Sequence, residues 1–290
     1  MKNIKKLASI LLVITLALSI VGCSSNNAQA PAAGTPEAST PEPAKAEPVT
    51  VKLGVVGENN EQWKPVIVAL AKENITLELV KFADYTLPNQ ALADGEIDLN
   101  AFQHYAFLKN EVKDKGLKLT AIGETIIAPL GLYSKKIKSI SELKEGDKIA
   151  IPNDATNGGR SLKVLESAGL IKVNPDAGYV PTVNDITENP LKFEFYEVEA
   201  AQTASLLPDV AAAIINGGHA VDAGYFPQTD AIYLETVAQG SDNPYINIIV
   251  ARTADKDKEL YKKVVDAFRT DEVAEVIKTA YKGAYIPAWK

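Results

Sequence analysis

From Val49 onward, apolar positions follow two alternating periods along the chain. Residues 49–55 alternate apolar and polar side chains, as in a strand, and residues 63–70 place apolar side chains at helical spacing, with Pro65 tolerable only in a first helical turn. Similar patterns predict further strands at 75–82, 97–102, 117–122, 126–133, 148–151, 192–198, 210–215, 231–234 and 245–250. They predict further helices at 88–94, 104–115, about 158–168, 258–268 and 272–282, and a short one near 141–144. This alternation indicates the α/β class, with a mostly parallel sheet covered by helices.

Two such cycles follow each other, the second starting after Ser134. Gly95, Gly116 and Gly169 come directly after predicted helices, where a left-handed residue commonly ends a helix. Residues 49–290 are enough for one doubly wound sheet or for two lobes with a cleft between them. The hydrophobic pattern alone leaves both arrangements open.

The first 22 residues have the pattern of a secretion signal. Three lysines precede an apolar run at 7–21, which is shorter than the roughly 20 residues that a membrane-spanning helix needs. The small residues before Cys23 resemble the bacterial lipobox, in which a peptidase cuts before the cysteine and its sulfur receives a diacylglycerol. The resemblance implies that residues 1–22 are removed and that a lipid on Cys23 anchors the protein at the extracytoplasmic face of the cell membrane. The alternative is an uncleaved anchor with a chance cysteine.

Residues 24–48 lack any large apolar side chain and contain five prolines. Such a segment buries too little surface to offset its chain entropy, so it predicts an extended, disordered tether. Together with the lipidated Cys23, it forms the predicted segment 23–48 between the signal peptide and the folded part.

Composition narrows the chemistry further. The formal charge of −7 and the pI near 5.1 provide no cationic surface for nucleic acid, so we expect no nucleic-acid partner. One cysteine excludes an internal disulfide framework, and two histidines are too few for a histidine-rich zinc site, although carboxylates remain able to hold a hard cation. We expect no metal and no cofactor.

The segment 153–160 follows a predicted strand and opens a helix. Its Asn and Thr side chains are natural caps, and its two glycines allow close approach, so free N–H groups at the helix start would face an anion. Arg160 adds a planar fork of donors that matches a carboxylate. The segment lacks the lysine and spacing of a phosphate loop and the glycine pattern of dinucleotide binders. The alternative is a plainly capped helix with a solvated arginine.

The segment 98–107 concentrates aromatic rings, amides and an imidazole at a predicted strand end, where ligands bind in open α/β sheets. Rings with few polar groups suit a small amphipathic ligand, and a neutral His104 would donate from one ring nitrogen while a backbone group fixes the other. The alternative is that Phe102 and Phe107 are core residues and that His104 caps a helix.

Three further strand ends carry weaker signals. Asn216, which offers both a donor and an acceptor, is followed by Gly217 and Gly218, and alone this is no better than an ordinary turn. Tyr85 after Asp84, and Asn247 near the C-terminal part, are equally weak singly.

Taken together and in order, these segments resemble the NlpA/MetQ family of lipoproteins, the methionine-binding components of ABC importers. The resemblance rests on residues 53–55, 84–85, 88–89, 100–104, 131–136, 151–160, 185–190, 215–217 and 244–247. It implies a two-lobed periplasmic-binding-protein fold, type II-like, with a ligand cleft between the lobes. The first lobe would comprise 49–131 plus 247–290, and the second 132–246.

The resemblance also implies a ligand-binding set. Its members are Tyr85, Phe102, His104, Phe107, Asn157, Arg160, Asn216 and Asn247. In the family, an arginine at the Arg160 position pairs with the ligand carboxylate, and asparagines like Asn216 and Asn247 hold the amino and carboxyl groups. The aromatic members would surround the thioether, whose polarisable sulfur packs favourably against rings.

The function that follows is an extracytoplasmic solute-binding lipoprotein, monomeric and not an enzyme, that captures methionine for an ABC permease and its ATPase. Gly218, His219 and the loop at 57–63 depart from the family pattern, which leaves L-methionine, D-methionine and a methionine-containing dipeptide open. Two other functions stay open: an extracytoplasmic enzyme that uses His104 near Asp98 as a base, and an adhesion module without a small ligand.

Overall fold

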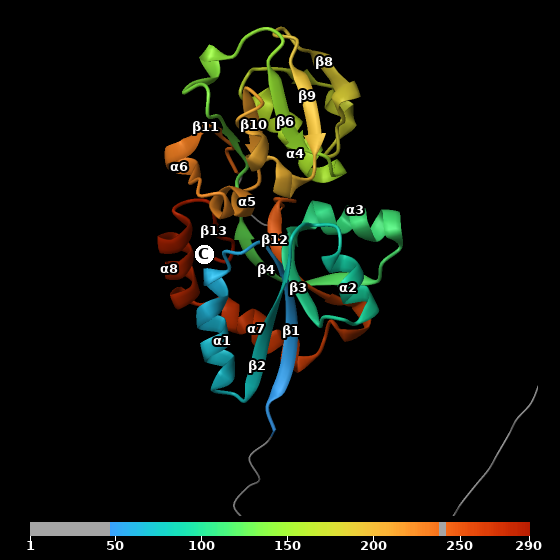
Figure 1. Ribbon diagram of the computed structural model, residues 1–290. Helices are drawn as coiled ribbons and strands as arrows, with labels where there is room; N and C mark the ends of the chain where they lie inside the picture. Colours follow the sequence, from blue (N-terminus) through green and yellow to red (C-terminus); the bar gives the residue numbers. More distant parts are fainter. Residues whose placement is uncertain (1–46, 238–241) are drawn as a thin grey trace, which may run out of the picture. The chain divides into compact units, whose positions relative to one another are not determined.

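The computed structural model describes residues 47–237 and 242–290, which Figure 1 shows in colour. The predicted signal peptide, the predicted lipidation site Cys23 and nearly all of the predicted tether lie outside these residues. Among the helices described, none is both long enough and apolar enough to cross a bilayer.

The first lobe is built on a six-stranded sheet with the strand order β13-β4-β12-β3-β1-β2. Its strands are β1 (Val49–Val56), β2 (Ile75–Phe82), β3 (Leu99–His104), β4 (Leu119–Ile127), β12 (Ile246–Arg252) and β13 (Ile286–Pro287). Strand β1 pairs in parallel with β2 and β3, whereas β12 pairs antiparallel with β3 and β4. The expected mostly parallel sheet is therefore mixed, because β12 enters after the chain returns from the second lobe rather than through a helical crossover.

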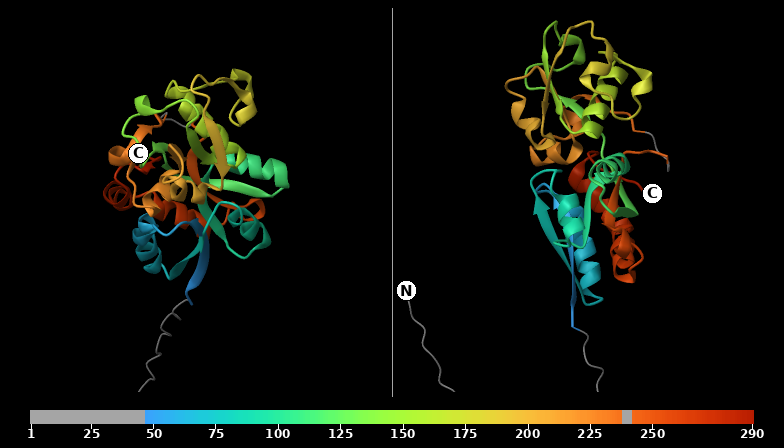
Figure 2. Two further views of the ribbon diagram at one scale, coloured as in Figure 1. Left: turned by 45° about the horizontal axis from the view of Figure 1, so that its top comes forward. Right: turned by 90° about the vertical axis from the view of Figure 1, so that its right-hand side faces the viewer.

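Helices cover both faces of this sheet. They are α1 (Lys64–Ala71), α2 (Pro88–Asp94), α3 (Tyr105–Lys115), α7 (Glu259–Phe268) and α8 (Asp271–Tyr281). Strand β12 shows why both faces are apolar: Ile249 and Ala251 pack with α1, α7 and α8, whereas Ile248 and Val250 pack with α2 and α3. Figure 1 shows the two groups of helices on opposite sides of the strands, and Figure 2 shows the same lobe, with its C-terminal helices in red, from two further directions.

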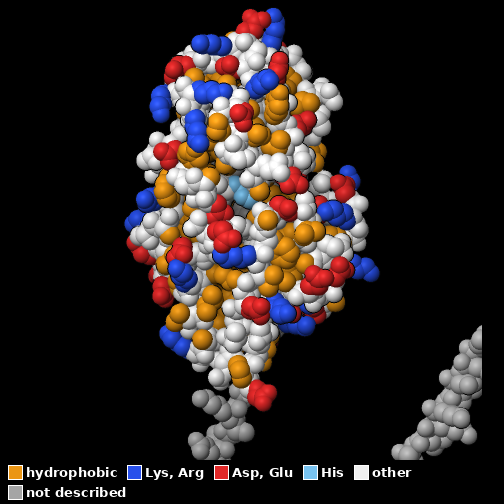
Figure 3. Space-filling model, viewed as in Figure 1, with side chains coloured by type: hydrophobic (Ala, Val, Ile, Leu, Met, Phe, Trp, Pro, Cys, Tyr) orange, Lys and Arg blue, Asp and Glu red, His pale blue; other side chains and the backbone are white. Residues whose placement is uncertain are grey.

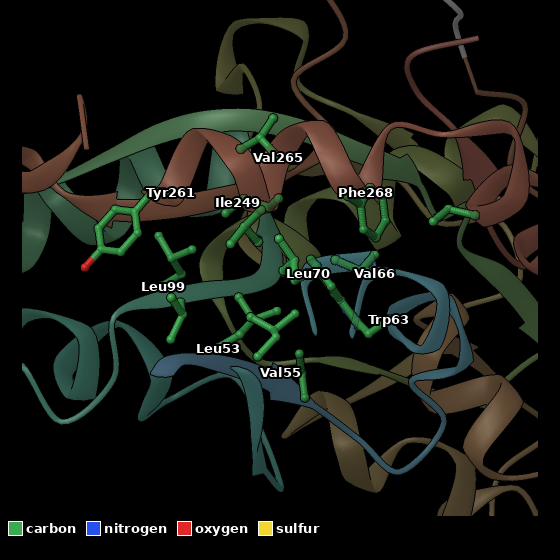
Figure 4. Packing of buried hydrophobic residues seen from close by; sticks show 14 of the residues in the cluster. Leu53, Val55, Trp63, Val66, Leu70, Leu99, Ile249, Tyr261, Val265 and Phe268 are labelled. Carbon is green, nitrogen blue, oxygen red and sulfur yellow. The ribbon is translucent and has the colours of Figure 1, made fainter. Parts of the chain in front are cut away.

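Trp63 lies at the centre of the larger apolar cluster of the first lobe. Its side chain is 1% exposed, and its ring centroid is 4.6 Å from that of Phe268 on α7. Figure 4 shows Trp63, Val66 and Phe268 close together between α1 and α7. Trp63 is therefore a core residue, and this packing fixes the start of α1 against the C-terminal part of the chain.

The second lobe is built on a five-stranded sheet with the order β11-β5-β10-β6-β9. Its strands are β5 (Gly131–Tyr133), β6 (Lys148–Pro152), β9 (Glu194–Val198), β10 (Ala212–Ile215) and β11 (Ala231–Leu234). Its helices are α4 (Ala155–Ser167), α5 (Gly217–Asp222) and α6 (Pro227–Asp230), and a separate hairpin pairs β7 (Lys172–Val173) with β8 (Ile186–Glu188). Alternate residues of β6 and β10 are buried on both faces, which places α4 against one side of the sheet.

The chain passes between the lobes twice, from β4 to β5 and from β11 back to β12. Leu130 and Glu235 join the two passages, because the backbone N–H of Glu235 donates to the Leu130 carbonyl at 2.9 Å. The strand predicted at 126–133 is therefore wrong as one element. Pro129 separates β4 from β5, and each belongs to a different sheet.

Helix α5 was not expected from the sequence, which indicated an ordinary turn after Asn216. Gly217 and Gly218 are poor helix formers, yet they occupy its first turn. Their missing side chains allow close packing: a Cβ at Gly217 would lie 2.9 Å from the Ala284 carbonyl, and one at Gly218 would lie 2.6 Å from the Tyr285 hydroxyl. Contacts with the C-terminal segment therefore select a helix that local propensity disfavours.

Candidate functional site

A cavity of about 70 Å³ lies among side chains of both lobes. All eight ligand-binding residues expected from the sequence line its wall. The first lobe contributes Tyr85, Phe102, His104, Phe107 and Asn247, and the second lobe contributes Asn157, Arg160 and Asn216. Residues that were not assigned to the site also line it, including Gln62, Gln103, Thr125, His219 and Tyr285. A space lined by aromatic rings and a few polar groups is typical of a binding site for a small molecule.

Aromatic side chains form one part of the wall. The Tyr85 ring centroid lies 5.8 Å from Phe102, 6.1 Å from Phe107 and 4.9 Å from His219, and Phe102 meets Phe107 edge to face. Burial raises the pKa of Tyr85, so this ring stays neutral, and burial lowers the pKa of His219. Phe107, at 7% exposure, is both a buried residue and a wall of the cavity. This part of the cavity is suited to an apolar side chain.

His104 links the aromatic part of the wall to a polar part. It is the N-cap of α3, where its Nδ1 accepts from the Phe107 backbone N–H at 3.0 Å. A neutral ring must then carry its proton on Nε2, which lies 3.4 Å from Asn157 Oδ1. Burial, assisted by the nearby Arg160 charge, lowers the pKa of His104 to about 3. His104 is thus a helix cap, as one interpretation predicted, and at the same time a neutral donor in the wall.

A chain of amides continues from His104 into the second lobe. Asn157 donates its Nδ2 to both carboxylate oxygens of Asp154, at 3.1 and 2.9 Å, which fixes its Oδ1 as an acceptor. That oxygen accepts from Asn216 Nδ2 at 2.9 Å. Within the described part of the chain, Asn216 Oδ1 is buried and has no hydrogen-bond partner. The chain of bonds therefore leaves one acceptor at the site without a donor.

The start of α4 corrects one expectation. The helix begins at Ala155, three residues before the predicted start, because Asp154 caps it and accepts from the Asn157 backbone N–H at 2.9 Å. The idea that free N–H groups near Gly158 and Gly159 face an anion is therefore wrong, since the carboxylate of Asp154 already occupies the helix start. The glycines instead allow close packing: a Cβ at Gly159 would lie 2.8 Å from Pro181 Cδ.

Arg160 forms a partly buried ion pair that sequence analysis missed. Its Nε donates to Glu235 Oε1 at 2.8 Å and its Nη2 to Glu235 Oε2 at 2.6 Å, while Nη2 also donates to the Ala128 carbonyl at 3.0 Å. The Tyr245 ring centroid lies 4.2 Å from Arg160 Cζ. With 2% exposure, Arg160 is not the solvated arginine of the alternative interpretation. Among the described residues, its Nη1 has no hydrogen-bond partner.

Glu235 holds Arg160 against the passages between the lobes. Its Oε2 also accepts from the Leu130 backbone N–H at 2.8 Å, so the carboxylate is fully engaged. Glu235 directly follows β11, so the strand-end criterion that singled out Asn216 was a signal that would have found it. Glu235 is not part of the lining, but it cancels the charge of Arg160, and both histidines are neutral because burial lowers their pKa values. The described lining together with Glu235 therefore carries no net charge. A ligand with no net charge fits such a site best.

Asn247 completes the polar part from strand β12, where it is paired with His104 in the sheet register. Its Nδ2 makes only a long bond of 3.5 Å to the Tyr245 carbonyl, which leaves the amide able to turn to a ligand. In the described ranges, no group of three or more His, Cys, Asp or Glu side chains is arranged as metal ligands.

His104 gives the protein a predicted sensitivity to acid. Its pKa is about 3 in the folded state and 6.5 in the unfolded state, so between these values the unfolded chain binds more protons and stability falls as the pH falls. From pH 7 to pH 5, this amounts to about 2 kcal/mol of unfolding free energy. His104→Asn retains a capping side chain but cannot ionise. Urea unfolding at both pH values should show that the unfolding free energy falls less between pH 7 and pH 5 in the variant than in the wild type. An equal fall in both proteins would contradict the assignment of this pH dependence to His104.

Comparison with known proteins identifies a family. Residues 51–289 match the NlpA lipoprotein family. The chain is 44% identical over 243 residues to the D-methionine-binding lipoprotein MetQ of Yersinia pestis, which covers 82% of this chain and 88% of that protein. A solved nutrient-binding protein from Burkholderia cenocepacia, bound to methionine, is 42% identical, with a TM-score of 0.78 over 82% of this chain and 99% of its own.

A third similar structure is the substrate-binding protein of a methionine transporter from Streptococcus pneumoniae. It is 38% identical, with a TM-score of 0.77, and the match covers 83% of this chain and 96% of that one. These neighbours confirm the predicted two-lobed periplasmic-binding-protein fold. With a family match that spans nearly the whole described chain, the protein belongs to the NlpA lipoprotein family.

Proposed function

We propose that this protein is an extracytoplasmic solute-binding lipoprotein that captures methionine and delivers it to the permease of an ABC importer. The observation that carries the proposal is the cavity in which Arg160 and Asn216 lie at a polar part and Tyr85, Phe102 and Phe107 at an aromatic part. The names of the relatives, one for D-methionine and two for methionine, support the same ligand. Binding requires no bond to be made or broken, so the protein is not an enzyme.

The contacts of the site suggest how each end of methionine is held. Arg160 Nη1 and Asn247 Nδ2 donate to the ligand carboxylate, and Asn216 Oδ1 accepts from the ammonium group. The thioether lies among the rings, where the polarisable sulfur packs favourably. Because the wall together with Glu235 has no net charge, the zwitterion enters without leaving an uncompensated charge in a dry space.

Both lobes contribute to the cavity, so the ligand bridges them. Affinity therefore comes from bringing the lobes together around the amino acid and expelling water. We place the division between the lobes at the two passages, next to the expected bounds of 49–131 plus 247–290 for the first lobe and 132–246 for the second. Gly131 then belongs with β5 to the second lobe, and Ile246 belongs with β12 to the first. The ligand-binding residues we propose are the eight expected from the sequence, all of which line the cavity.

The rest of the proposal concerns location and partners. Removal of residues 1–22 and lipidation of Cys23 would hold the protein on the outer face of the cytoplasmic membrane, and residues 23–48 would connect the anchor to the binding part. A monomer in this position delivers its ligand to a permease that an ATPase drives. Mass spectrometry of membrane-extracted protein tests the anchor, because a diacylglycerol on Cys23 adds a defined mass.

A panel of analogues tests the ligand. We expect methionine to bind, whereas N-acetylmethionine and methionine methyl ester, each without one of its charges, should bind at least about a hundredfold more weakly. Norleucine lacks only the sulfur, so a loss of about tenfold or less is expected. Isothermal titration with both enantiomers and with a methionine dipeptide decides among the ligands left open. Equal affinity for methionine and its methyl ester would contradict the proposal.

A further inference from the structure

Helix α5 of the second lobe contacts the loop after β1 of the first lobe. Asp222, its last residue, accepts three hydrogen bonds from this loop: one from the Glu58 backbone N–H at 3.0 Å, and two from Asn59, through its backbone N–H at 2.9 Å and its Nδ2 at 2.7 Å. The partners lie 163 and 164 positions apart in the sequence. One carboxylate of the second lobe is thus held by three N–H donors of the first.

The loop is shaped to receive this carboxylate. Gly57 has a φ of +82°, which residues with a side chain rarely adopt, and a Cβ there would overlap an oxygen of Asp222. Both the backbone conformation and the lack of space therefore require glycine. Asn60 Nδ2 donates to the Gly57 carbonyl at 2.9 Å, and Lys81 Nζ lies 2.6 Å from Glu58 Oε2. Both contacts hold the loop from within the first lobe. The two backbone N–H groups therefore face Asp222 without rearrangement.

The contact borders a second hollow, which lies next to the ligand cavity. This hollow, of about 630 Å³, is on the outside and is lined by Gly57, Glu58 and Asp222. His219, on the same helix as Asp222, lines both this hollow and the ligand cavity, so its ring forms part of the wall between them. Figure 3 shows a histidine side chain at the bottom of a hollow on the face that it presents.

We infer that Asp222 is a positioning residue that latches the second lobe onto the first and thereby sets how fast the ligand leaves. If the lobes separate, all three hydrogen bonds are lost together. Helix α5 then also carries His219 away from Tyr85, although the centroids of the two rings lie only 4.9 Å apart in this structure. The contact is exposed, so water replaces part of what is lost and the effect on the free energy is moderate. The inference rests on the proposed function in so far as it names methionine as the ligand that is released. The latch itself can be observed in the protein without ligand.

The test compares Asp222→Asn with Asp185→Asn in the full-length protein. Asp185 also accepts a backbone N–H and a side-chain bond, both from Thr182, but within one lobe. We expect Asp222→Asn to raise the rate of methionine release and the Kd by about tenfold, equivalent to about 1.4 kcal/mol. Asp185→Asn should leave both unchanged. Stopped-flow release and calorimetry measure the two, and wild-type values for Asp222→Asn would overturn the latch.

Exchanging the carboxylate and the amide between positions 222 and 59 tests whether Asp222 acts through its contact with Asn59 or only through a general structural role. Asn59→Asp places a second carboxylate against Asp222, so release should accelerate as the like charges repel. Adding Asp222→Asn to this variant gives an amide that can donate to the new carboxylate, so the double variant should release methionine more slowly than Asn59→Asp alone. Faster or equal release from the double variant contradicts the assignment.

Amide hydrogen exchange distinguishes failure of the latch from failure of the proposed ligand. In the protein without ligand, the Glu58 and Asn59 amides should exchange faster in Asp222→Asn than in the wild type, because both donate to Asp222. Unchanged exchange overturns the latch whatever the ligand is. If exchange changes but the wild type does not bind methionine, the latch stands and the proposed ligand fails.

Discussion

Arg160→Ala is expected to abolish methionine binding. The alanine removes the only permanently charged donor among the described residues that line the cavity, and the ligand carboxylate would enter a dry space without a counter-charge. The loss of such a pair is expected to weaken binding by about 3 kcal/mol or more, roughly a hundredfold or more in Kd. Isothermal titration with methionine measures it, and an unchanged Kd would remove Arg160 from the proposed site.

The same variant should also be less stable, which must be separated from its binding defect. Glu235, whose side chain is 13% exposed, would keep a mostly buried carboxylate without its partner, although the Leu130 backbone N–H still donates to it. Breaking a fully buried pair typically costs about 3–5 kcal/mol, so we expect a loss of unfolding free energy below that range. The double variant Arg160→Ala with Glu235→Ala removes the unpaired charge. We expect it to regain much of the unfolding free energy in urea without regaining binding. Recovery of binding in the double variant would show that Arg160 acts through folding alone.

Trp63→Ala is expected to cause a large loss of stability. The indole is almost fully buried and packs on Phe268, and alanine would leave a cavity at the junction of α1 and α7. Replacing a buried aromatic side chain with alanine typically lowers the unfolding free energy by about 3–5 kcal/mol. Urea unfolding followed by far-UV circular dichroism measures the change without depending on tryptophan fluorescence.

The control for this variant is Trp63→Phe, which keeps an aromatic ring against Phe268. Within the described part of the chain, Trp63 Nε1 is buried without a hydrogen-bond partner, so phenylalanine loses no such bond. We expect a loss of about 1–2 kcal/mol, from the smaller volume alone. A loss below 1 kcal/mol for Trp63→Ala would show that the start of α1 contributes little to the core.

Local signals in the sequence predicted several elements closely. The strand at 75–82 and the helix at 88–94 are confirmed as β2 and α2 with these bounds, and Gly95 ends α2 in the left-handed conformation. Their signals are short-range: alternation in the strand, and a proline at the start and a glycine after the end of the helix. Where the deciding contact is distant, as for β12 and its antiparallel neighbours, the expected mostly parallel sheet was wrong.

The side chains of the site show the same difference between local signals, which the sequence reveals, and distant contacts, which it does not. Arg160, His104 and Asn216 were expected around one ligand because the resemblance to the NlpA/MetQ family implies it, and the structure places them around one cavity. Their partners were not expected. Glu235 reaches Arg160 across 75 positions, and Asp222 reaches the loop at Glu58 across 164. No periodicity or turn signal couples positions that far apart.

By itself, the sequence determined the α/β class, the order of most elements and the residue types that gather at strand ends, because hydrophobic spacing, caps and glycine stops act within a few residues. Only the tertiary structure decided that Arg160 is already neutralised by Glu235, that α5 forms despite its glycines, and that Asp222 joins the two lobes. Each of these depends on a carboxylate or a close packing contact brought by a distant part of the chain. Burial strengthens the Arg160–Glu235 pair in particular, because a charge or a hydrogen bond acts far more strongly away from water.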